Sequence, residues 1–421
     1  MFTSFSSALS ALNATSTAID VVGNNLANMN TPGFKTSQMV FSDLVTESLG
    51  AGLGSTQVGF GTSTPMTVRE FTQGAIQTSA GVLDAAIQGN GFFVVQDSNG
   101  NPLYTRAGNF QTDAEGNLLT DMGDKVQGWT TIDPATGAVD TNGPIGNIVV
   151  PVGSVAPPTA TTQITADLNL NASATADSTS TFTVPVTAYD SLGNPHVMTL
   201  NFQKTGSNQW SYDVTIPGED ISGGTAGTPF DTGASGTLTF NQNGQLTDPP
   251  SGSPISIAVT GLADGAADMN ISWNPYESSG NARITQFGQP SESSATSQNG
   301  EAAGQLVQVG LATGGTILAQ YTNGAQLVVG QVALANIRNP DSLIAVGDNN
   351  YQLSSRTAAP SVGMPNTGGR GTIQGGSLEA STVDIATEFT NLIVYQRGYE
   401  ANAHVITTAD QLSQDTINLI R

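Results

Sequence analysis

Apolar residues recur with heptad spacing at both ends of this chain, and this pattern constrains the fold more than any other feature. The N-terminal pattern takes alternating steps of three and four residues through Phe2, Phe5, Leu9, Leu12, Ser16, Ile19, Gly23 and Leu26. Such steps place side chains on one stripe of an α-helix, the stripe that packs on another helix. The pattern therefore predicts an N-terminal helix that ends near Asn28.

The C-terminal pattern repeats every seven residues through Leu378, Ile385, Leu392, Tyr399, Ile406, Ser413 and Ile420, with Phe389, Ala403 and Ile417 at intervening positions. No Pro follows Pro365 and no Gly follows Gly398. We expect a helix from about Val383 to Ile420, roughly 55 Å long at about 1.5 Å per residue.

Two amphipathic helices at opposite ends of one chain bury their apolar stripes most simply against each other. An ordinary helical hairpin that caps a globular body has the same pattern, so this alternative stays open. We call the larger apolar members of both patterns the predicted seam: Phe2, Phe5, Leu9, Leu12, Ile19, Leu26, Ile385, Phe389, Leu392, Tyr399, Ile406 and Ile417.

The N-terminal pattern stops at an asparagine-rich segment, "NNLANMNTPGFKT", at residues 24–36. Asn and Gly favour left-handed and turn conformations, and Pro32 disfavours the helical conformation of Thr31. Asn side chains can satisfy carbonyl groups at a helix end while Gly allows a reversal. The segment predicts a helix stop followed by a change of chain direction.

The residues between the helices read as β-structure. "GFFVVQDSNGNPLYTRAGNF" alternates short β-prone runs with Asn-Gly and Gly-Asn turn signals, as hairpins do. Between about 152 and 288, Thr and Ser dominate, which indicates a separate β-domain inserted into the first one. The expected fold is multidomain α+β, with coiled-coil-like pairing of the terminal helices and two nested, mainly-β domains. The expected divisions are a terminal helical domain (1–30 and 376–421), a connecting segment (31–71 and 357–375), an inner β-domain (72–151 and 289–356) and an outer inserted β-domain (152–288).

Composition argues against several classes of partner. The net charge is −22 and only 11 residues are Lys or Arg. Nucleic acids and anionic membranes are bound by clustered basic residues, so neither is expected as a partner. No apolar run approaches the ~20 residues of a membrane span, and no basic start or continuous apolar core indicates a cleaved secretory signal.

Signals for catalysis are poor. The two histidines, His196 and His404, lie in different predicted domains, and the chain has no Cys. No phosphate-binding loop, nucleophile elbow or paired-histidine metal motif occurs. We therefore expect no enzyme activity and no catalytic, cofactor-binding or metal-binding residues.

Four segments, in order along the chain, resemble conserved blocks of bacterial flagellar rod and hook proteins. They are "NNLANMNTPGFK", "FTQGAIQTSAGVLDAAIQGNGFFVV" followed by "YTRAGNFQTDAEGNLLT", "GQVALANIRNPDSLIAVGDNNY" and "GSLEASTVDIATEFTNLIVYQRGYEANAHVITTADQL". Together they cover about half of the chain. The elbow motif of the family matches here at Asn24, Asn25, Asn28, Asn30, Thr31, Gly33 and Phe34.

The resemblance implies a structural subunit that assembles with itself into a tube, with the terminal helices in the inner wall and the predicted seam as its assembly contact. The large insert favours the hook, a flexible curved tube that transmits torque from motor to filament. The implied partners are the flagellar rod, the hook cap, the hook–filament junction proteins and the flagellar export apparatus. The implied location is extracellular, after export without a cleaved signal peptide.

Two alternatives remain at this point. A distal flagellar rod protein would share the same conserved blocks. A secreted β-rich adhesin would account for the middle domain but not for heptad patterns at both ends.

Overall fold

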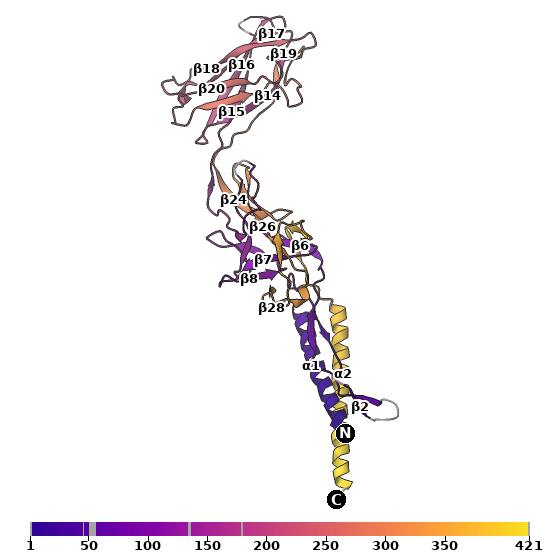
Figure 1. Cartoon of the computed structure of the whole chain (residues 1–421). Helices are drawn as coiled ribbons and strands as arrows, with labels where there is room; N and C mark the ends of the chain where they lie inside the picture. The colour runs from indigo at the N-terminus through magenta and orange to yellow at the C-terminus, as the bar shows by residue number, and fades with distance from the viewer. Residues whose placement is uncertain (1, 45, 50–55, 134–135, 178–179, 420–421) are drawn as a thin grey trace. The chain divides into compact units, whose positions relative to one another are not determined.

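The computed structural model describes residues 2–44, 46–49, 56–133, 136–177 and 180–419, which are mainly β-structure with a long helix at either end (Figure 1). The chain divides into two units. The first unit comprises Met1–Val152, Gln308–Ala319 and Leu327–Arg421, and the second comprises Gly153–Val307 and Gln320–Gln326. The predicted outer limit at residue 288 falls short of this division, because β23 (Glu292–Gln298) pairs with β14 (Gln163–Asn171) in the second unit.

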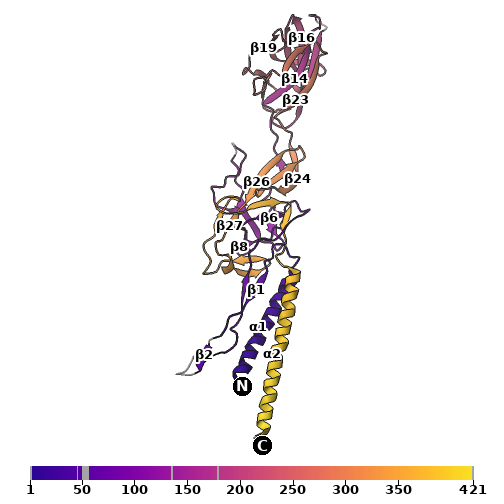
Figure 2. The same ribbon diagram turned by 90° about the vertical axis from the view of Figure 1, so that its right-hand side faces the viewer.

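The terminal helices predicted from the heptads are confirmed. Helix α1 spans Phe2–Ala27 and helix α2 spans Ile385–Leu419. At the end of α1, the Asn24 carbonyl accepts both the backbone N–H of Asn28, at 3.2 Å, and the Asn28 side chain, at 2.9 Å. Before α2, the Asp384 carboxylate accepts the backbone N–H of Thr387 at 2.8 Å, as an N-cap does. Figures 1 and 2 both show the two helices side by side.

Short two-stranded ladders join the segments next to the helices. The pairs are β1 (Ser37–Val40) with β4 (Met66–Arg69), β2 (Thr46–Leu49) with β3 (Thr56–Gly59), β5 (Ile76–Thr78) with β32 (Ser377–Glu379), and β6 (Ala85–Gln88) with β31 (Thr372–Gly375). The last two pairs link residues about 300 positions apart in the sequence. They hold the segment that follows α1 beside the segment that precedes α2.

The first unit is built on a large antiparallel sheet. Its strand order continues from β24 through β25, β26, β11, β7, β8 and β29 to β28, and short strands extend it at the sides. The bounds are β7 (Phe92–Gln96), β8 (Pro102–Thr105), β9 (Phe110–Thr112), β10 (Leu118–Thr120), β11 (Lys125–Trp129), β12 (Gly146–Asn147), β24 (Gly304–Leu311), β25 (Thr316–Tyr321), β26 (Gln326–Val332), β27 (Leu334–Asn336), β28 (Ile344–Gly347), β29 (Asn350–Gln352) and β30 (Ser361–Gly363).

Both sides of this sheet bury apolar side chains. Phe93, Leu118 and Ile148 belong to one cluster, and Phe92 and Tyr351 belong to another. The run "FFVV" of β7 is buried at every position, as expected for a strand covered on both faces.

The second unit is a β-sandwich with one apolar core. One sheet has the order β20-β21-β14-β22, with β23 on β14, and the other has the order β15-β16-β17-β18-β19. Strand β14 alternates buried and half-buried residues, the pattern of a strand with one face in the core. The remaining bounds are β13 (Val155–Ala156), β15 (Thr181–Tyr189), β16 (Pro195–Gly206), β17 (Gln209–Pro217), β18 (Pro229–Phe240), β19 (Leu246–Asp248), β20 (Ile255–Val259), β21 (Met269–Trp273) and β22 (Ile284–Phe287), with short 3-10 helices at η1 (Gly218–Asp220) and η2 (Pro340–Ser342), the latter in the first unit.

A five-residue turn, Asp-x-x-Gly-Asn, recurs at 97–101, 113–117 and 190–194. In each, the Asp Oδ1 accepts the backbone N–H of the Asn four residues later, at 2.7–2.9 Å. The Gly adopts positive φ in all three turns, which a residue with a Cβ adopts only with strain. The Asn and Gly signals in the sequence thus mark these hairpins correctly.

Candidate assembly surface

Helices α1 and α2 pack against each other within the chain, and each buries part of its surface. On α1, the buried apolar residues are Ala8, Ala14, Ala18 and Val22. On α2, a Cβ placed at Gly398 would lie 3.6 Å from the Thr15 methyl group, an ordinary van der Waals contact between the two helices. Two of these residues, Ala8 and Ala18, lie one residue before Leu9 and Ile19 of the predicted seam.

The predicted seam stays largely uncovered in the single chain. Phe5 and Leu9 on α1 are 42% and 44% exposed, whereas Leu12, Ile19 and Leu26 are half-buried. On α2, Leu392 and Ile406 are half-buried, and the exposed members are Ile385, Phe389, Tyr399 and Ile417. Of the eleven seam residues whose side chains are described, six are thus exposed and five are half-buried, and the mutual burial of the two seams stays a prediction. The side chain of Phe2, and all of Ile420, lie outside the described residues.

The fully buried apolar residues of α1 are smaller than the seam residues. Heptad analysis gives weight to large apolar side chains, whereas closely packed helices select Ala, Gly and Thr at their contact. The large side chains remain beside the contact, where a further helix can reach them. Their role in assembly stays a prediction.

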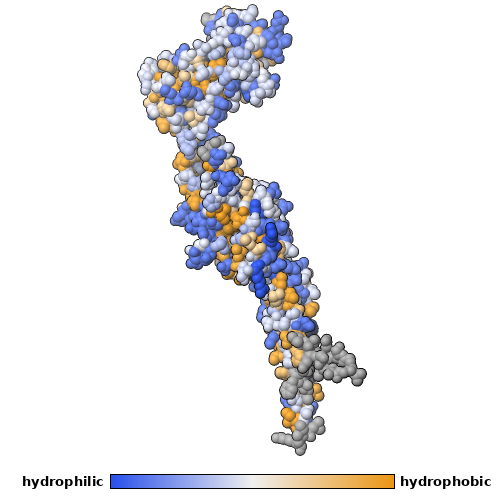
Figure 3. All heavy atoms as spheres, viewed as in Figure 1, coloured by the Kyte–Doolittle hydropathy of each residue, from blue (hydrophilic) through white to orange (hydrophobic). Residues whose placement is uncertain are grey.

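Helix α2 carries a second exposed apolar stripe, formed by Val394, Val405 and Leu412. These residues are eleven and seven positions apart, close to whole numbers of helical turns, so they share one side of the helix. At about 100° per residue, that side lies opposite Phe389 and Tyr399. Figure 3 shows apolar atoms reaching the surface along the helices. α2 thus presents two apolar stripes outside its contact with α1.

Residues of the elbow motif hydrogen-bond the end of α1 to strand β1, to strand β32 and to the turn before β29. Asn25 is buried, and its side chain exchanges hydrogen bonds of 2.8 and 3.1 Å with the backbone of Ser37. The Gly33 N–H donates to the carbonyl of Glu379 at 2.8 Å, and Asn349 donates to the carbonyl of Pro32 at 2.9 Å.

Gly33 could not be replaced without strain. It has φ +72°, and a Cβ there would lie 2.6 Å from backbone atoms of Arg106 and Ala107. Phe34 is buried next to it, Thr31 is half-buried, and Asn24 and Asn30 are exposed. The structure therefore brings most elbow residues into one turn, but it leaves two of the asparagines at the surface.

A buried ionic cluster lies directly after the elbow. Lys35 Nζ is 2.6 Å from Glu379 Oε1, and Arg106 Nη1 is 3.2 Å from Glu379 Oε2. The Lys35 and Glu379 side chains have no exposed surface. Burial lowers the pKa of Lys35, and the Glu379 carboxylate opposes that shift. The cluster ties the segment after α1, the residue that follows strand β8 and strand β32 together at one point.

A second buried acid connects the two helices. Asn25 Nδ2 donates to Glu388 Oε1 at 3.0 Å. Burial raises the pKa of Glu388, while the hydrogen bond from Asn25 opposes this. Sequence reasoning missed Glu379 and Glu388, because nothing in the local pattern shows which acids become buried by residues more than 300 positions away.

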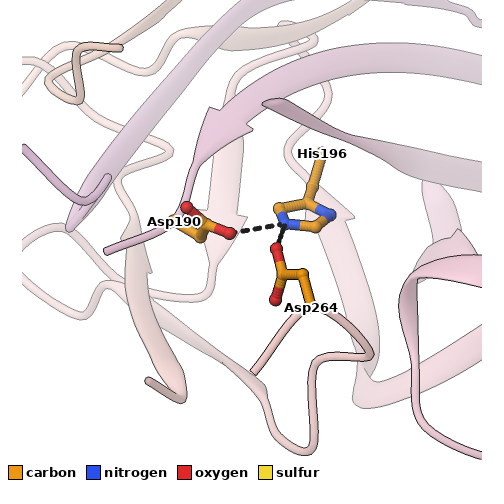
Figure 4. Close-up of side chains that lie close together, drawn as sticks. All are labelled: Asp190, His196 and Asp264. Atoms are coloured by element: carbon orange, nitrogen blue, oxygen red, sulfur yellow. Dashed lines mark hydrogen bonds and ion pairs between the residues drawn. The ribbon is translucent and has the colours of Figure 1, made fainter. Parts of the chain in front are cut away.

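His196 lies in the second unit among three carboxylates, those of Asp190, Asp220 and Asp264 (Figure 4 shows two of them). Burial disfavours its charged form, but hydrogen bonds and charges of Asp220 and Asp190 raise the pKa of His196 above its usual value. His404 lies far along the chain on α2 and is exposed. Sequence reasoning did not anticipate the cluster around His196; its one local signal is a His six residues after the Asp of a turn.

None of the helices among the described residues is long and apolar enough to cross a membrane.

Family models match in order along the chain. The model of the flagella basal body rod protein matches residues 5–35, and that of the flagellar hook protein FlgE/F/G D1 domain matches 86–167. The flagellar basal body protein FlaE D2 domain matches 156–301, and the flagellar basal body rod FlgEFG protein C-terminal region matches 374–419.

Whole-length relatives decide the family. The chain is 35% identical to the flagellar hook protein FlgE of Salmonella typhimurium, over 99% of this chain and 100% of the relative. It is 34% identical to that of Escherichia coli, over 99% of each chain, and 33% identical to that of Borreliella burgdorferi, over 100% of each. The chain belongs to the family of flagellar hook proteins. It is a structural subunit of the flagellar hook, and the rod-protein and adhesin alternatives are not favoured.

A solved hook protein supports the fold. The crystal structure of Helicobacter pylori flagellar hook protein FlgE2 superposes with a TM-score of 0.52 at 14% identity, covering 72% of this chain and 100% of that one. The resemblance stated from the sequence is thus confirmed, and the family is a structural one, not a family of enzymes.

Proposed function

We propose that this hook protein assembles with copies of itself into a flexible tube, and that α1 and α2 form the inner wall through coiled-coil-like contacts between subunits. The observation that carries the proposal is the apolar surface of the helices. The exposed seam residues and the stripe of Val394, Val405 and Leu412 are left uncovered by the contact within the chain.

The energetics favour association of these surfaces. Burying one large apolar side chain contributes about 1.5–3 kcal/mol, and soluble monomers rarely leave such stripes open to water. Because α2 has a stripe on each of two sides, one helix can contact two neighbours. Contacts on two sides are what a closed wall of repeated subunits requires.

The elbow and the buried ionic cluster set how the helices join the β-structure. We infer that they transmit force from the wall to the β-units, since hydrogen bonds and ion pairs there connect three chain segments. The second unit is the nested outer domain in this proposal. Its polar, turn-rich surface suits weak, exchangeable contacts that allow subunits to slide as the tube bends.

We also propose partners and a location for the chain. The partners are the flagellar rod, the hook cap, the hook–filament junction proteins and the flagellar export apparatus. The location is outside the cell, reached without cleavage of the N-terminus, because α1 itself is needed in the wall. We propose no catalytic activity for the chain.

The test places a charge in the seam. Phe389 is exposed in the single chain, so Phe389→Asp leaves the monomer fold intact and disfavours burial between subunits. Gln411→Asp is the matched control, because Gln411 is exposed on α2 and, at about 100° per residue, faces away from both stripes. We expect sedimentation and electron microscopy to show tubes for the control and none for Phe389→Asp. Tubes formed by Phe389→Asp at the wild-type rate would refute the proposed contact.

A further inference from the structure

We propose that the second unit holds a divalent cation between the side chains of Asp190, His196 and Asp264 (Figure 4). The ligand atoms are His196 Nε2 and the Oδ2 atoms of the two aspartates. One ligand atom from each residue lies within 4.8 Å of the others. The chemical class that fits one imidazole nitrogen and two carboxylate oxygens is a borderline ion such as Zn²⁺.

Two of the three distances between the ligand atoms suit a bound metal ion. His196 Nε2 is 3.2 Å from Asp190 Oδ2 and 3.6 Å from Asp264 Oδ2. Ligand atoms bound tetrahedrally at about 2.1 Å stand about 3.4 Å apart. The two observed distances lie on either side of that value, so an ion in the middle needs only small side-chain adjustments.

Asp220 supports the imidazole from its other side. Its Oδ2 is 3.0 Å from His196 Nδ1, and His196 is 5% exposed. The contact lacks hydrogen-bond geometry, but the negative charge of Asp220 favours a proton on Nδ1, which leaves the Nε2 lone pair to bind a cation. Carboxylate–histidine–metal arrangements of this kind are common at zinc sites. When no cation is bound, the Nε2–H of the protonated ring donates to Asp190, and a cation bound at Nε2 displaces that proton.

The net charge around His196 also favours a bound cation. Three carboxylates surround one imidazole, and the ion pairs of the described residues include no Lys or Arg with any of these three carboxylates. Even with a protonated imidazole, the group carries −3 + 1 = −2. Asp190 has no exposed side-chain surface, and buried charge of one sign is costly unless a counter-ion is present.

The neighbouring hydrogen bonds position the two carboxylates. Asp190 Oδ1 accepts the N–H groups of Leu192 and Asn194 within its turn, at 2.8 and 2.9 Å. Asn194 Nδ2 donates to Asp264 Oδ2 at 2.9 Å and to Asp190 Oδ2 at 3.4 Å. These bonds leave each Oδ2 a further lone pair for a metal, because an ionised carboxylate oxygen has two.

The turn at 190–194 differs from the other two Asp-x-x-Gly-Asn turns in the residue that follows it. Asp97 and Asp113 form the same five-residue turn, but Leu103 and Leu119 stand six residues later, where His196 follows Asp190. Asp190 precedes β16 of one sheet, and Asp264 precedes β21 of the other. A bound cation would therefore cross-link the two sheets of the sandwich.

The experiment is equilibrium dialysis of the full chain against Zn²⁺ at neutral pH. We expect one Zn²⁺ per chain, loss of that binding in Asp264→Asn, and about 10–100-fold weaker binding in Asp220→Asn. His404→Gln is the matched control, because His404 is the other histidine and the chain has no Cys. This control should bind as the wild type does. Absence of saturable binding, unchanged binding in Asp264→Asn, or loss in His404→Gln would each overturn the proposal.

A second measurement avoids any effect of substitution on folding. Nitrogen NMR of the unmodified chain, labelled in its histidine rings, resolves two imidazoles. Zn²⁺ should shift the Nε2 signal of His196 and leave both signals of His404 unchanged. A titration that shifts only His404, or neither ring, contradicts the site.

Discussion

At the scale of single residues, buried charge concentrates where the chain leaves α1 and approaches α2. Glu379 pairs with Lys35 and Arg106, and its Oε1 also accepts the N–H of Gly74 at 2.8 Å. Removing one partner from a buried ionic group costs more than the pair contributes, because the remaining charges stay out of water. The joint between helices and β-structure therefore depends on one carboxylate.

Glu379→Gln should destabilise the first unit by about 3–5 kcal/mol, since it leaves two buried cations without a counter-charge. Glu400→Gln is the control, because Glu400 pairs with Arg397 at the surface and exposed pairs contribute little. Denaturant unfolding of both variants checks this. Equal midpoints for Glu379→Gln and the wild type would contradict the assigned role.

Glu388 predicts a pH dependence. Its folded-state pKa is raised above the usual 4.5, with burial as the main cause. The folded chain therefore binds this proton more tightly than the unfolded chain, and the stability it adds is lost as pH rises above about 4.5 through the folded pKa. Glu388→Gln cannot ionise and should remove this loss. As pH rises from acid to neutral, the protection of α2 amides in the variant should therefore increase relative to that in the wild type. Hydrogen exchange at matched pH measures it, and a constant difference between the two proteins would contradict the shift.

At the scale of elements, the sequence predicted both terminal helices closely, whereas the residues that bury each other between them stay a prediction. The predicted stop near Asn28 and start near Val383 agree with the observed ends at Ala27 and Ile385, since caps and breakers act locally. The contact stripe was missed because Ala8, Ala14 and Ala18 carry little hydrophobic signal. The hairpins were recognised from Asn-Gly and Gly-Asn turns. The pairing of β14 with β23, about 130 residues apart, has no local signal.

Removing either helix should block assembly and spare the β-structure. Deletion of residues 1–28 or 384–421 takes away one side of the helix contact but leaves the Lys35–Glu379–Arg106 cluster in place. We expect circular dichroism of both truncated chains to keep the β-signal, and sedimentation to show no polymer. Normal tubes from either chain would show that the helices are dispensable.

At the scale of the whole molecule, the second unit is a continuous stretch, Gly153–Val307, with a short addition at Gln320–Gln326. Its core draws on both of its own sheets. Such units are commonly removable, because few contacts cross their boundaries. A change in composition indicated an insert from the sequence. The C-terminal boundary of that insert depends on the pairing of β23 with β14, which the sequence does not show.

Joining Val152 to Gln308 through a short Gly/Ser linker should give a chain that still forms tubes, because the helices and the first unit remain. The tubes should lose regular curvature, since contacts between second units are gone. Electron microscopy of these tubes measures both properties. Wild-type curvature would mean that the second unit only decorates the surface.

The most direct measurement of the central claim is a helical reconstruction of the full-length polymer by electron cryomicroscopy. We expect α1 and α2 in the inner wall, with Phe389, Leu9 and the stripe of Val394, Val405 and Leu412 buried against neighbouring subunits. A map in which these side chains face the lumen or solvent, or in which the helices lie outside the wall, would contradict it.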